Sequence, residues 1–580
     1  MRIRLPRRLR DERGMALAFA VLLLLVVSAM AAGALAVTSS SVLVNRMYER
    51  GSALERGAEQ GIEVARALVN ADPDLYPAEG FAVIEQEAAV LDGEGTPIPG
   101  VSRWTYVGPS GILSGQYGIF GTAVSVVRDA GRGVAIRRSQ LFQESFARFA
   151  YFTDIEPSNI YFGGGDQIFG PVHSNDRIKI HSTGATFHSE VRTAEDVTGE
   201  EYGDFRQGFV EGVQAIPLPE TQELETLRGQ AQEGGTHFVA PGNPANGATL
   251  RIEFMAVDLN NDGATTGANE GFIRVYQSND VTWLMARAPA NGLRNSDNCG
   301  HFHPNGIFIP ASAHPDNGPD SWVASLTNNQ RRCFLGGTDA LFGGFVANDG
   351  DGAWLQWGGA VSPLVQGRPD GSYLIPITRA LNPNFKGVIF VDGNVVLSGT
   401  LRGRVTLAAT GDIYFGDDLV YATDPGAGTC VDILGLFGGE EVVVADNTLN
   451  SPQQPAPGNN WVNYDDTEDE YFHAVILALD KFTVENFNAG ARTTSPCGNT
   501  LWGRGCLYVT GGIIQATRGA VGQTSNPGGY GYIKRYAYDL CAAMEPPPYF
   551  PTTGHFYKGA LYQVDPAGFD IDDFFDQIGS

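Results

Sequence analysis

Positive charge is scarce in this chain beyond its first fourteen residues. The 580 residues include 39 lysines and arginines but 65 aspartates and glutamates, so the formal net charge is −26 at pH 7. Six of those arginines lie between Arg2 and Arg13, beside only two acids, so the rest of the chain is more acidic than the total. An acidic surface repels phosphate backbones, and we therefore expect no nucleic-acid partner.

Short motifs of common enzymes and metal sites are missing as well. The sequence contains no Gly-x-Ser-x-Gly elbow, no P-loop, no His-Glu-x-x-His and no Cys-x-x-Cys. His301 and His303 could form a metal pair if folding supplied a third ligand such as His314, but exposed loop histidines are the simpler interpretation. We therefore expect that the chain is not an enzyme.

One long apolar run stands near the start of the chain. The run from Met15 to Val37, which includes Leu22 and Leu25, carries no charge. As a helix that rises about 1.5 Å per residue, it spans roughly 35 Å, enough to cross the hydrocarbon core of a bilayer. The arginines flank this run on its amino side alone, so the amino end is predicted to stay in the cytoplasm while the rest is exported.

The helical pattern continues past the apolar run. Apolar residues recur on one helical face, and the helix is predicted to end near Asp72-Pro73, because the residue before a proline is pushed out of the α region. A secretory signal ending at Ala34-Leu35-Ala36 would have an apolar core of only about 7–15 residues. A plain membrane anchor is the other alternative. The residues on the repeating face are Met47, Leu54, Ala58, Ile62, Ala65 and Leu68.

The start of this helix resembles a known leader. Arg13-Gly14-Met15-Ala16-Leu17, after a basic stub, resembles a type IV prepilin leader, and residues 45–66 resemble the amphipathic half of the PilX-like minor pilins. The resemblance implies that a prepilin peptidase cuts between Gly14 and Met15 and methylates the new amino terminus. It also implies that other pilin or pseudopilin subunits are partners.

One position departs from the pilin pattern. Major pilins carry a glutamate at the fifth mature position, where this chain has Phe19. A carboxylate inside a bilayer is costly unless it is paired, and the family's glutamate is thought to pair with the terminal amine of a neighbouring subunit. Phe19 cannot make that contact. The resemblance therefore favours a minor, initiating or tip subunit.

Beyond the helix, the composition favours a mainly β protein. Glycine occurs 74 times and proline 32 times, while charged residues make up 18% of the chain. Strand-like runs at 118–127 and 133–141 predict a small pilin-like sheet. Later runs are shorter and are bounded by glycine, asparagine or aspartate, which predicts rungs of a right-handed parallel β-helix. A β-sandwich, the alternative, requires longer alternating strands.

The predicted organisation has seven parts. They are a basic prepilin-type leader (1–14), a transmembrane and amphipathic helix (15–72), a small β-rich pilin-like unit (73–155), the first β-helix rungs (156–194), an inserted α+β region (195–385), the main β-helix rungs (386–560) and an acidic tail (561–580).

Four phrases in the later regions resemble an exported bacterial family that joins a PilX-like amino terminus to a β-helical body. The function of that family is poorly defined, so the resemblance supports the architecture more than an activity. The phrases are Gly170–Asp176, Asp432–Phe437, Gly512–Gly522 and Pro546–Pro551.

One loop resembles the first half of a calcium-binding loop. Asp258, Asn260 and Asp262 place oxygen ligands at positions one, three and five, and Gly263 follows for the bend. The acid expected at position twelve is replaced by an asparagine, with Glu270 one step later. The sequence therefore predicts a Ca²⁺ site, and the alternative is a turn between two strands.

Cysteine is absent from the first half of the chain. All six cysteines are predicted to lie on the exported side, where an even count favours disulfides. Proximity favours Cys497 with Cys506 and Cys299 with Cys333, and buried unpaired thiols are the alternative. The disulfide candidates are Cys299, Cys333, Cys430, Cys497, Cys506 and Cys541.

Together these features predict a minor pilin-like or pseudopilin-like subunit of a type IV pilus or a type II secretion assembly. The helix would start in the bacterial inner membrane, and the exported head would lie in the periplasm, on the pilus or at the cell surface, where it would bind a surface glycan or a protein. One alternative is a surface-binding β-helix protein held permanently in the membrane. Another is a carbohydrate-active β-helix enzyme, which rests on fold analogy alone.

Overall fold

The computed structural model divides the chain into two compact units. Unit 1 comprises Met1–Ile112, Phe120–Phe142 and Phe556–Ser580, and unit 2 comprises Leu113–Ile119 and Gln143–His555. Unit 2 is therefore inserted into the sequence of unit 1. The residues that the structure describes are 12–77, 79–109, 118–130, 133–241, 247–260, 262–278, 301–302, 308–309, 352–366, 371–445, 469–485, 487–488, 497, 505–525, 528–565 and 573.

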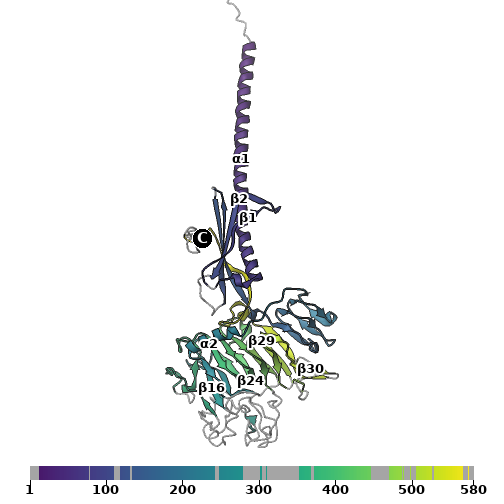
Figure 1. The fold of residues 1–580 in the computed structure, drawn as a ribbon, viewed down its shortest axis with the longest axis vertical. Helices are drawn as coiled ribbons and strands as arrows, with labels where there is room; N and C mark the ends of the chain where they lie inside the picture. Colours follow the sequence, from purple (N-terminus) through teal and green to yellow (C-terminus); the bar gives the residue numbers. More distant parts are fainter. Residues whose placement is uncertain are drawn as a thin grey trace, which may run out of the picture. The chain divides into compact units, whose positions relative to one another are not determined.

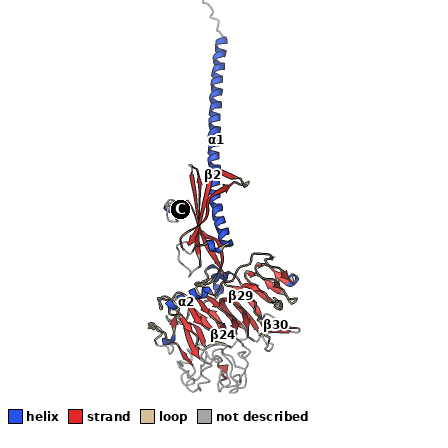
Figure 2. Cartoon of the chain, viewed as in Figure 1, coloured by secondary structure: helices blue, strands red, loops and turns tan. Residues whose placement is uncertain are grey.

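Unit 1 combines one long helix, α1 (Glu12–Ala71), with an antiparallel sheet (Figures 1 and 2). The strands of the sheet are β1 (Ala82–Leu91), β2 (Pro97–Pro109), β3 (Phe120–Asp129), β4 (Gly133–Ser145) and β32 (Thr552–Val564). The first four each pair antiparallel with the next. β32 lies beside β4, so the chain returns to this sheet after passing through unit 2.

Helix α1 ends at Ala71, directly before the stop that the sequence predicts. Asp72 is extended, with φ −141° and ψ 93°, and Pro73 opens a short 3-10 turn, Pro73–Leu75. The Asp72 carboxylate accepts a hydrogen bond from the Asp74 amide at 3.2 Å. The proline therefore ends the helix, and the aspartate satisfies an amide of the following turn.

The buried face of α1 differs slightly from the predicted one. Met47 and Leu68 are exposed, and the other four predicted residues are buried. Val69 replaces Leu68, because spacings of four, four, three and four residues keep one side of a 3.6-residue helix against the sheet. Met47 lies before the packed stretch begins. The buried face is Leu54, Ala58, Ile62, Ala65 and Val69.

Two glycines on this face let α1 approach the sheet closely. A Cβ on Gly61 would lie 2.1 Å from Ser125 Oγ and 2.8 Å from Arg103 Cδ. A Cβ on Gly57 would lie 2.7 Å from Val90 Cγ1. The Gly57 carbonyl also accepts a hydrogen bond from Arg103 Nη1 at 3.1 Å. The contact between helix and sheet therefore requires very small residues at these two positions.

Unit 2 begins with short parallel strands at a regular interval. The strands are β5 (Tyr151–Ile155), β6 (Asp166–Phe169), β7 (Val172–Ser174), β8 (Ile178–Lys179), β9 (Ala185–Phe187), β10 (Val191–Thr193), β11 (Val197–Thr198), β12 (Gly203–Phe205) and β13 (Phe209–Val210). Val172 pairs with Val191, 19 positions later, and Val191 pairs with Phe209, 18 positions later. The parallel strands thus continue past residue 194, where the sequence-based boundary lies.

A second series of strands begins at the same interval, and its parallel pairs are farther apart in sequence from β23 onward. They are β21 (Val388–Asp392), β22 (Val395–Leu401), β23 (Arg404–Ala409), β24 (Ile413–Tyr421), β25 (Ile433–Gly438), β26 (Val442–Val444), β27 (Glu470–Ala478), β28 (Phe482–Val484), β29 (Gly505–Thr517), β30 (Gly522–Ser525) and β31 (Gly528–Tyr538). Val388 pairs in parallel with Thr406, and Val395 with Ile413, each 18 positions later. After β31, a short helix, α6 (Leu540–Met544), precedes the return to unit 1.

The region between the two series contributes to the same sheet. Its elements are α2 (Gln222–Gly234), β14 (His237–Val239), β15 (Leu250–Ala256), β16 (Gly271–Ser278), β19 (Gly352–Trp354) and β20 (Ile375–Pro376). β14 and β15 pair in parallel with β21 and β22, while β16 pairs antiparallel with β15. The described strands of the region at 195–385 therefore belong to the large sheet, apart from β11, which pairs with β8, and β17 (His301–Phe302) and β18 (Phe308–Ile309), which pair with each other.

The first strands of unit 2 pair with its last ones. Tyr151 in β5 pairs in parallel with Ile513 in β29, and Ile168 in β6 pairs with Tyr536 in β31. One ladder consequently runs through β13, β10, β7, β5, β29, β27, β25, β23, β21 and β14. Figure 1 labels β29, a strand of this ladder, and β24, which pairs with β22 and β26 in a second ladder of the same sheet.

A row of apolar side chains runs along this ladder from β21 to β10, one from each of these eight strands and in register. We call it the core row. Each member is at most 1% exposed, and full burial of such a side chain contributes about 1.5–3 kcal/mol. The chain is thus mainly β with a long amino-terminal helix and a large parallel sheet, as the sequence predicts. The core row is Ile389, Leu407, Leu436, Ile476, Ile513, Tyr151, Val172 and Val191.

Substitution of Gly61 tests the close packing of α1. Gly61→Val is expected to destabilise unit 1 by about 1–3 kcal/mol, because added methyl groups force a packed contact apart. Gly51→Val is the matched control, since a Cβ at Gly51 meets no atom within 4 Å. Hydrogen–deuterium exchange of β2 and β3 peptides, in the full chain in detergent, should be faster in the first variant alone. Equal exchange in the two variants would contradict the close contact.

Candidate functional site

The amino-terminal half of α1 presents a long apolar surface that none of the described residues covers. By length and composition, α1 is the helix of the described residues that could cross a membrane. All residues from 15 to 49 are exposed, among them Leu22, Leu25 and Val37. Phe19, at the position of the pilin glutamate, is 68% exposed. Lipid or the helices of other subunits are the surroundings that suit such a surface.

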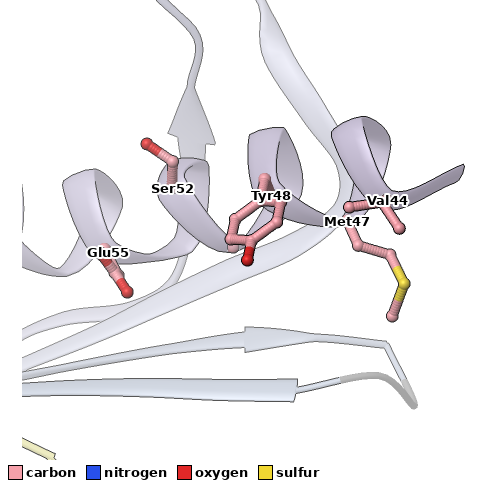
Figure 3. A pocket seen from close by; sticks show the side chains of 6 residues that line it. Val44, Met47, Tyr48, Ser52 and Glu55 are labelled. Carbon is pink, nitrogen blue, oxygen red and sulfur yellow. The ribbon is translucent and has the colours of Figure 1, made fainter. Parts of the chain in front are cut away.

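A groove lies along α1 where its exposed apolar part gives way to the packed part (Figure 3). Its volume is about 580 Å³. Figure 3 shows the lining side chains on successive turns of the helix. Nearby, Arg50 Nη2 donates to Asp129 Oδ1 at 2.6 Å, which raises the pKa of Arg50. The lining residues are Val44, Met47, Tyr48, Gly51, Ser52 and Glu55.

Polar contacts hold the returning strand β32 to α1. Asn70 Nδ2 donates to the Phe556 carbonyl at 3.0 Å, and the Phe556 amide donates to Asn70 Oδ1 at 2.7 Å. Lys558 Nζ lies 2.5 Å from Glu63 Oε1, and this hydrogen bond lowers the pKa of Glu63. The strand that leaves unit 2 is thereby anchored to the helix that begins the chain.

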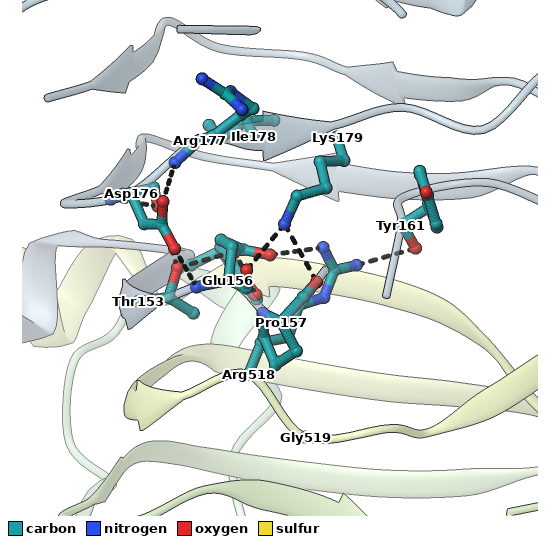
Figure 4. A network of polar contacts seen from close by, with 12 residues as sticks. Thr153, Glu156, Pro157, Tyr161, Asp176, Arg177, Ile178, Lys179, Arg518 and Gly519 are labelled. Carbon is teal, nitrogen blue, oxygen red and sulfur yellow. Dashed lines mark hydrogen bonds and ion pairs between the residues drawn. The ribbon is translucent and has the colours of Figure 1, made fainter. Parts of the chain in front are cut away.

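In unit 2, a buried ion pair joins the first strands to the last (Figure 4). Arg518 Nη1 donates to Glu156 Oε2 at 2.9 Å, and both side chains are at most 1% exposed. Glu156 Oε1 accepts hydrogen bonds from Thr153 Oγ1 at 2.7 Å and from the Tyr151 hydroxyl at 3.1 Å. The guanidinium carbon lies 3.7 Å from the ring centroid of Phe162. Both charges therefore have partners that compensate for their removal from water.

The segment after Glu156 is fixed by the same network. Lys179 Nζ donates to the carbonyls of Glu156 at 2.6 Å and Pro157 at 2.9 Å. Arg518 Nη2 donates to the Tyr161 carbonyl at 3.0 Å. Figure 4 shows these contacts converging on the segment. Its backbone is therefore held by side chains that are distant in sequence.

A cavity of about 530 Å³ opens beside this segment. Asp166 and Lys534 line it, with Lys534 Nζ 2.7 Å from Asp166 Oδ2 and with side-chain exposures of 2% and 12%. Burial lowers the pKa of Lys534, and the nearby Asp166 opposes that effect. Neither residue is a predicted site residue, because nothing local in the sequence marks a pair 368 positions apart. Further lining residues are Asn159, Tyr161, His181, Asn488, Gln523 and Tyr532.

The first phrase that resembles the exported family anchors the segment leading to α2. Asn175 Oδ1 accepts a hydrogen bond from the Ile216 amide at 2.9 Å, and Asn175 Nδ2 donates to the Ile216 carbonyl at 2.7 Å. His173 stacks on Phe152, with ring centroids 5.2 Å apart and planes at 7°. Burial lowers the pKa of His173. The described contacts of this phrase are structural.

The second and fourth phrases meet at β25. A Cβ on Gly435 would lie 2.5 Å from Phe550 and 2.8 Å from Pro547, so the segment Pro546–Pro551 packs directly against this strand. Asp432 Oδ1 accepts hydrogen bonds from Arg402 Nη1 at 2.9 Å and from the Gly403 amide at 2.7 Å. Glycine allows the close approach, and the aspartate fixes the turn before the strand.

The third phrase supplies Gln515 and Arg518. Gln515 Oε1 accepts hydrogen bonds from the amides of Phe482 at 2.9 Å and Gly519 at 3.1 Å. Because Arg518 pairs with Glu156, this phrase connects the last strands to the first. The described contacts of the four phrases therefore hold parts of unit 2 together.

Two disulfides are present among the described cysteines. Cys430 bonds Cys541, 111 positions later, and Cys497 bonds Cys506, the pair that proximity favours. The first links the strand region around β25 to α6. The other proximity pair, Cys299 with Cys333, lies outside the described residues.

The oxygens of the predicted calcium loop accept hydrogen bonds from the loop itself. Asp258 Oδ2 accepts from the Gly263 amide at 2.9 Å, and Asn260 Oδ1 accepts from the Asp262 amide at 2.9 Å. Glu270 is buried and accepts from the Leu259 amide at 3.0 Å. Across the described ranges, no group of three or more histidine, cysteine, aspartate or glutamate residues could hold a metal ion. Calcium binding by Asp258, Asn260 and Asp262 stays a prediction.

Several predicted residues cannot be placed by side chain. Gly14 lies within the first turn of α1, next to Met15, and residues 1–11 lie outside the described residues. His303 and His314 also lie outside them. Of the acidic tail, residues 561–565 belong to unit 1.

Comparison with known proteins adds little to this description. No family model matches the chain, and no curated protein matches it. The crystal structure of the competence-associated pilin ComZ from Thermus thermophilus is similar over 88% of this chain and 96% of that chain, at 12% identity and a TM-score of 0.24. A score this low carries no argument, so the proposals below rest on this chain's own residues.

Removal of Arg518 tests the buried pair. Arg518→Met is expected to destabilise unit 2 by about 3–5 kcal/mol, because it leaves the Glu156 carboxylate buried without its cation. Arg192→Met is the matched control, since Arg192 forms an exposed pair with Glu190, and such pairs contribute about 0–1 kcal/mol. Urea unfolding of the full chain, followed by tyrosine fluorescence, measures both. Equal midpoints for the two variants would contradict a joining role for Arg518.

Proposed function

We propose that this chain is a minor pilin-like or pseudopilin-like subunit of a type IV pilus or a type II secretion assembly. The main support for the proposal is that α1 has an exposed apolar half and a half that packs on a sheet. Its apolar half, residues 15–49, is exposed throughout, and its second half packs on an antiparallel sheet through a stripe of small and apolar residues. A helix of this kind is stable in lipid before assembly and among other helices afterwards.

The apolar half has the chemistry that extraction from a membrane requires. Residues 15–45 contain no charge, and the first charged residue after the leader is Arg46. We propose that a prepilin peptidase cuts between Gly14 and Met15 and methylates the new terminus. Phe19 avoids the cost of a carboxylate in lipid but forgoes a pairing partner, which suits a subunit used once at a tip rather than repeatedly along a shaft.

The head is proposed to be a right-handed parallel β-helix, joined to a PilX-like amino terminus as in the exported bacterial family. Strand pairs 18 or 19 positions apart and the continuous core row support this assignment. The two ends of the inserted segment meet: the Phe146 amide donates to the Pro551 carbonyl at 3.2 Å, and Thr552 Oγ1 donates to Gln143 Oε1 at 2.6 Å. Such an insertion leaves the sheet of unit 1 continuous and suits a large head displayed for surface adhesion.

Two alternative functions are compatible with some of these features. A surface-binding protein held permanently in the membrane would use the same helix without cleavage. A carbohydrate-active enzyme would require paired acids in a cleft, and the acid that lines the described cavity, Asp166, is paired with Lys534. The assembly proposal uses both halves of α1, and for that reason we prefer it.

Substitution of Gly14 tests the processing step. Gly14→Leu is expected to block cleavage, because a bulky side chain replaces the small residue at the scissile bond, and to abolish surface display. Gly33→Leu, within the apolar helix, is the matched control, since a Cβ at Gly33 meets no atom within 4 Å. Intact mass and surface labelling of cells measure the two effects. An unchanged mass and undiminished display in the Gly14 variant would favour the permanent anchor.

A further inference from the structure

The cavity beside Tyr161 combines features of a built ligand site. Its volume of about 530 Å³ falls inside the usual range of about 300–1,000 Å³ for small-molecule cavities. One wall is Asn159–Tyr161, the end of the segment from Glu156 to Tyr161 that Lys179 and Arg518 hold in place. A wall fixed before a ligand arrives lowers the ordering cost of binding.

Both hydrogen-bond donors and acceptors line this cavity. Lys534 Nζ has three N–H donors, and within the described residues Asp166 is its hydrogen-bond partner. Asp166 accepts from Lys534 Nζ, from the Lys534 amide at 3.3 Å and from the Gly163 amide at 3.1 Å, and a carboxylate has room for about four such bonds. Lys534 can therefore donate further hydrogen bonds, and the neighbouring Asp166 carboxylate can accept another.

Planar side chains complete the lining. Asn159, Asn488 and Gln523 each carry an amide that can donate and accept, and Tyr161 is 43% exposed. Within the described ranges, the side chains of Asn159 and Gln523 make no hydrogen bond to another residue. A sugar ring presents hydroxyls that both donate and accept, together with C–H faces that pack on aromatic rings.

The charge of the cavity decides between a neutral and an anionic sugar. Among the described residues that line it, Lys534 supplies the one ammonium, which Asp166 compensates at 2.7 Å. No arginine is among these described residues, so they offer no bidentate partner for a carboxylate. We propose that this cavity binds one neutral sugar unit of a surface glycan. The inference rests on the adhesive role proposed above, to which it adds a site and a ligand class.

Calorimetric titration of the full chain with single sugars tests the proposal. The probes are glucose, galactose, mannose, N-acetylglucosamine and lactose, with glucuronate as the anionic comparison, in a detergent that has no sugar headgroup. At least one neutral sugar is expected to bind saturably. Asn159→Leu and Gln523→Leu are each expected to weaken it about tenfold or more, which corresponds to about 1.4 kcal/mol. These two positions avoid the buried pair, whose removal would disturb the fold.

Gln207→Leu is the matched control. Gln207 is exposed in the same unit and does not line the cavity, so its substitution should leave binding unchanged. The proposal is overturned if no neutral sugar saturates, if glucuronate binds more tightly, or if the cavity variants behave like the control. Binding is measured on purified chain without any assembly, so a failure of Gly14 processing would leave this result intact.

Discussion

The large sheet of unit 2 depends on apolar side chains that stack in register from one parallel strand to the next. A short strand cannot bury its inner face alone, so each residue of the core row is shielded by the residues before and after it. Tyr151 pairs with Ile513 at the point where the first and last strands of the unit meet. The ladder is continuous because β29, near the end of unit 2, pairs with β5 at its start. The buried pair of Arg518 and Glu156 lies where these two strands meet.

Unit 1 depends on close packing between helix α1 and its sheet. Gly57 and Gly61 have no side chain, which allows the helix to approach the sheet closely. The first half of α1 instead exposes large apolar side chains. One helix thus serves two environments, and the change occurs near Leu54. Within unit 1, Asn70 and Glu63 hold strand β32 to this packed half of the helix.

Local signals in the sequence were sufficient for some features and not for others. The end of α1 follows from Asp72-Pro73, and Cys497 bonds Cys506 across only 9 positions. No local pattern shows that β32 rejoins the first sheet, because an alternating strand has the same sequence appearance in either sheet. Arg518 and Glu156 lie 362 positions apart, so only the folded chain reveals their pairing and the cavity beside them. Leu68 was expected inside because a one-residue change of helical phase is invisible without the sheet.

The central claim is that the apolar half of α1 leaves the membrane and packs among the helices of an assembly. A photo-reactive residue placed at Leu25, in cells that make the assembly, tests this directly. We predict crosslinks to the apolar helices of other pilin or pseudopilin subunits in the fraction sheared from the cell surface. Crosslinks confined to lipid in the membrane fraction, with no chain in the sheared fraction, would contradict the claim.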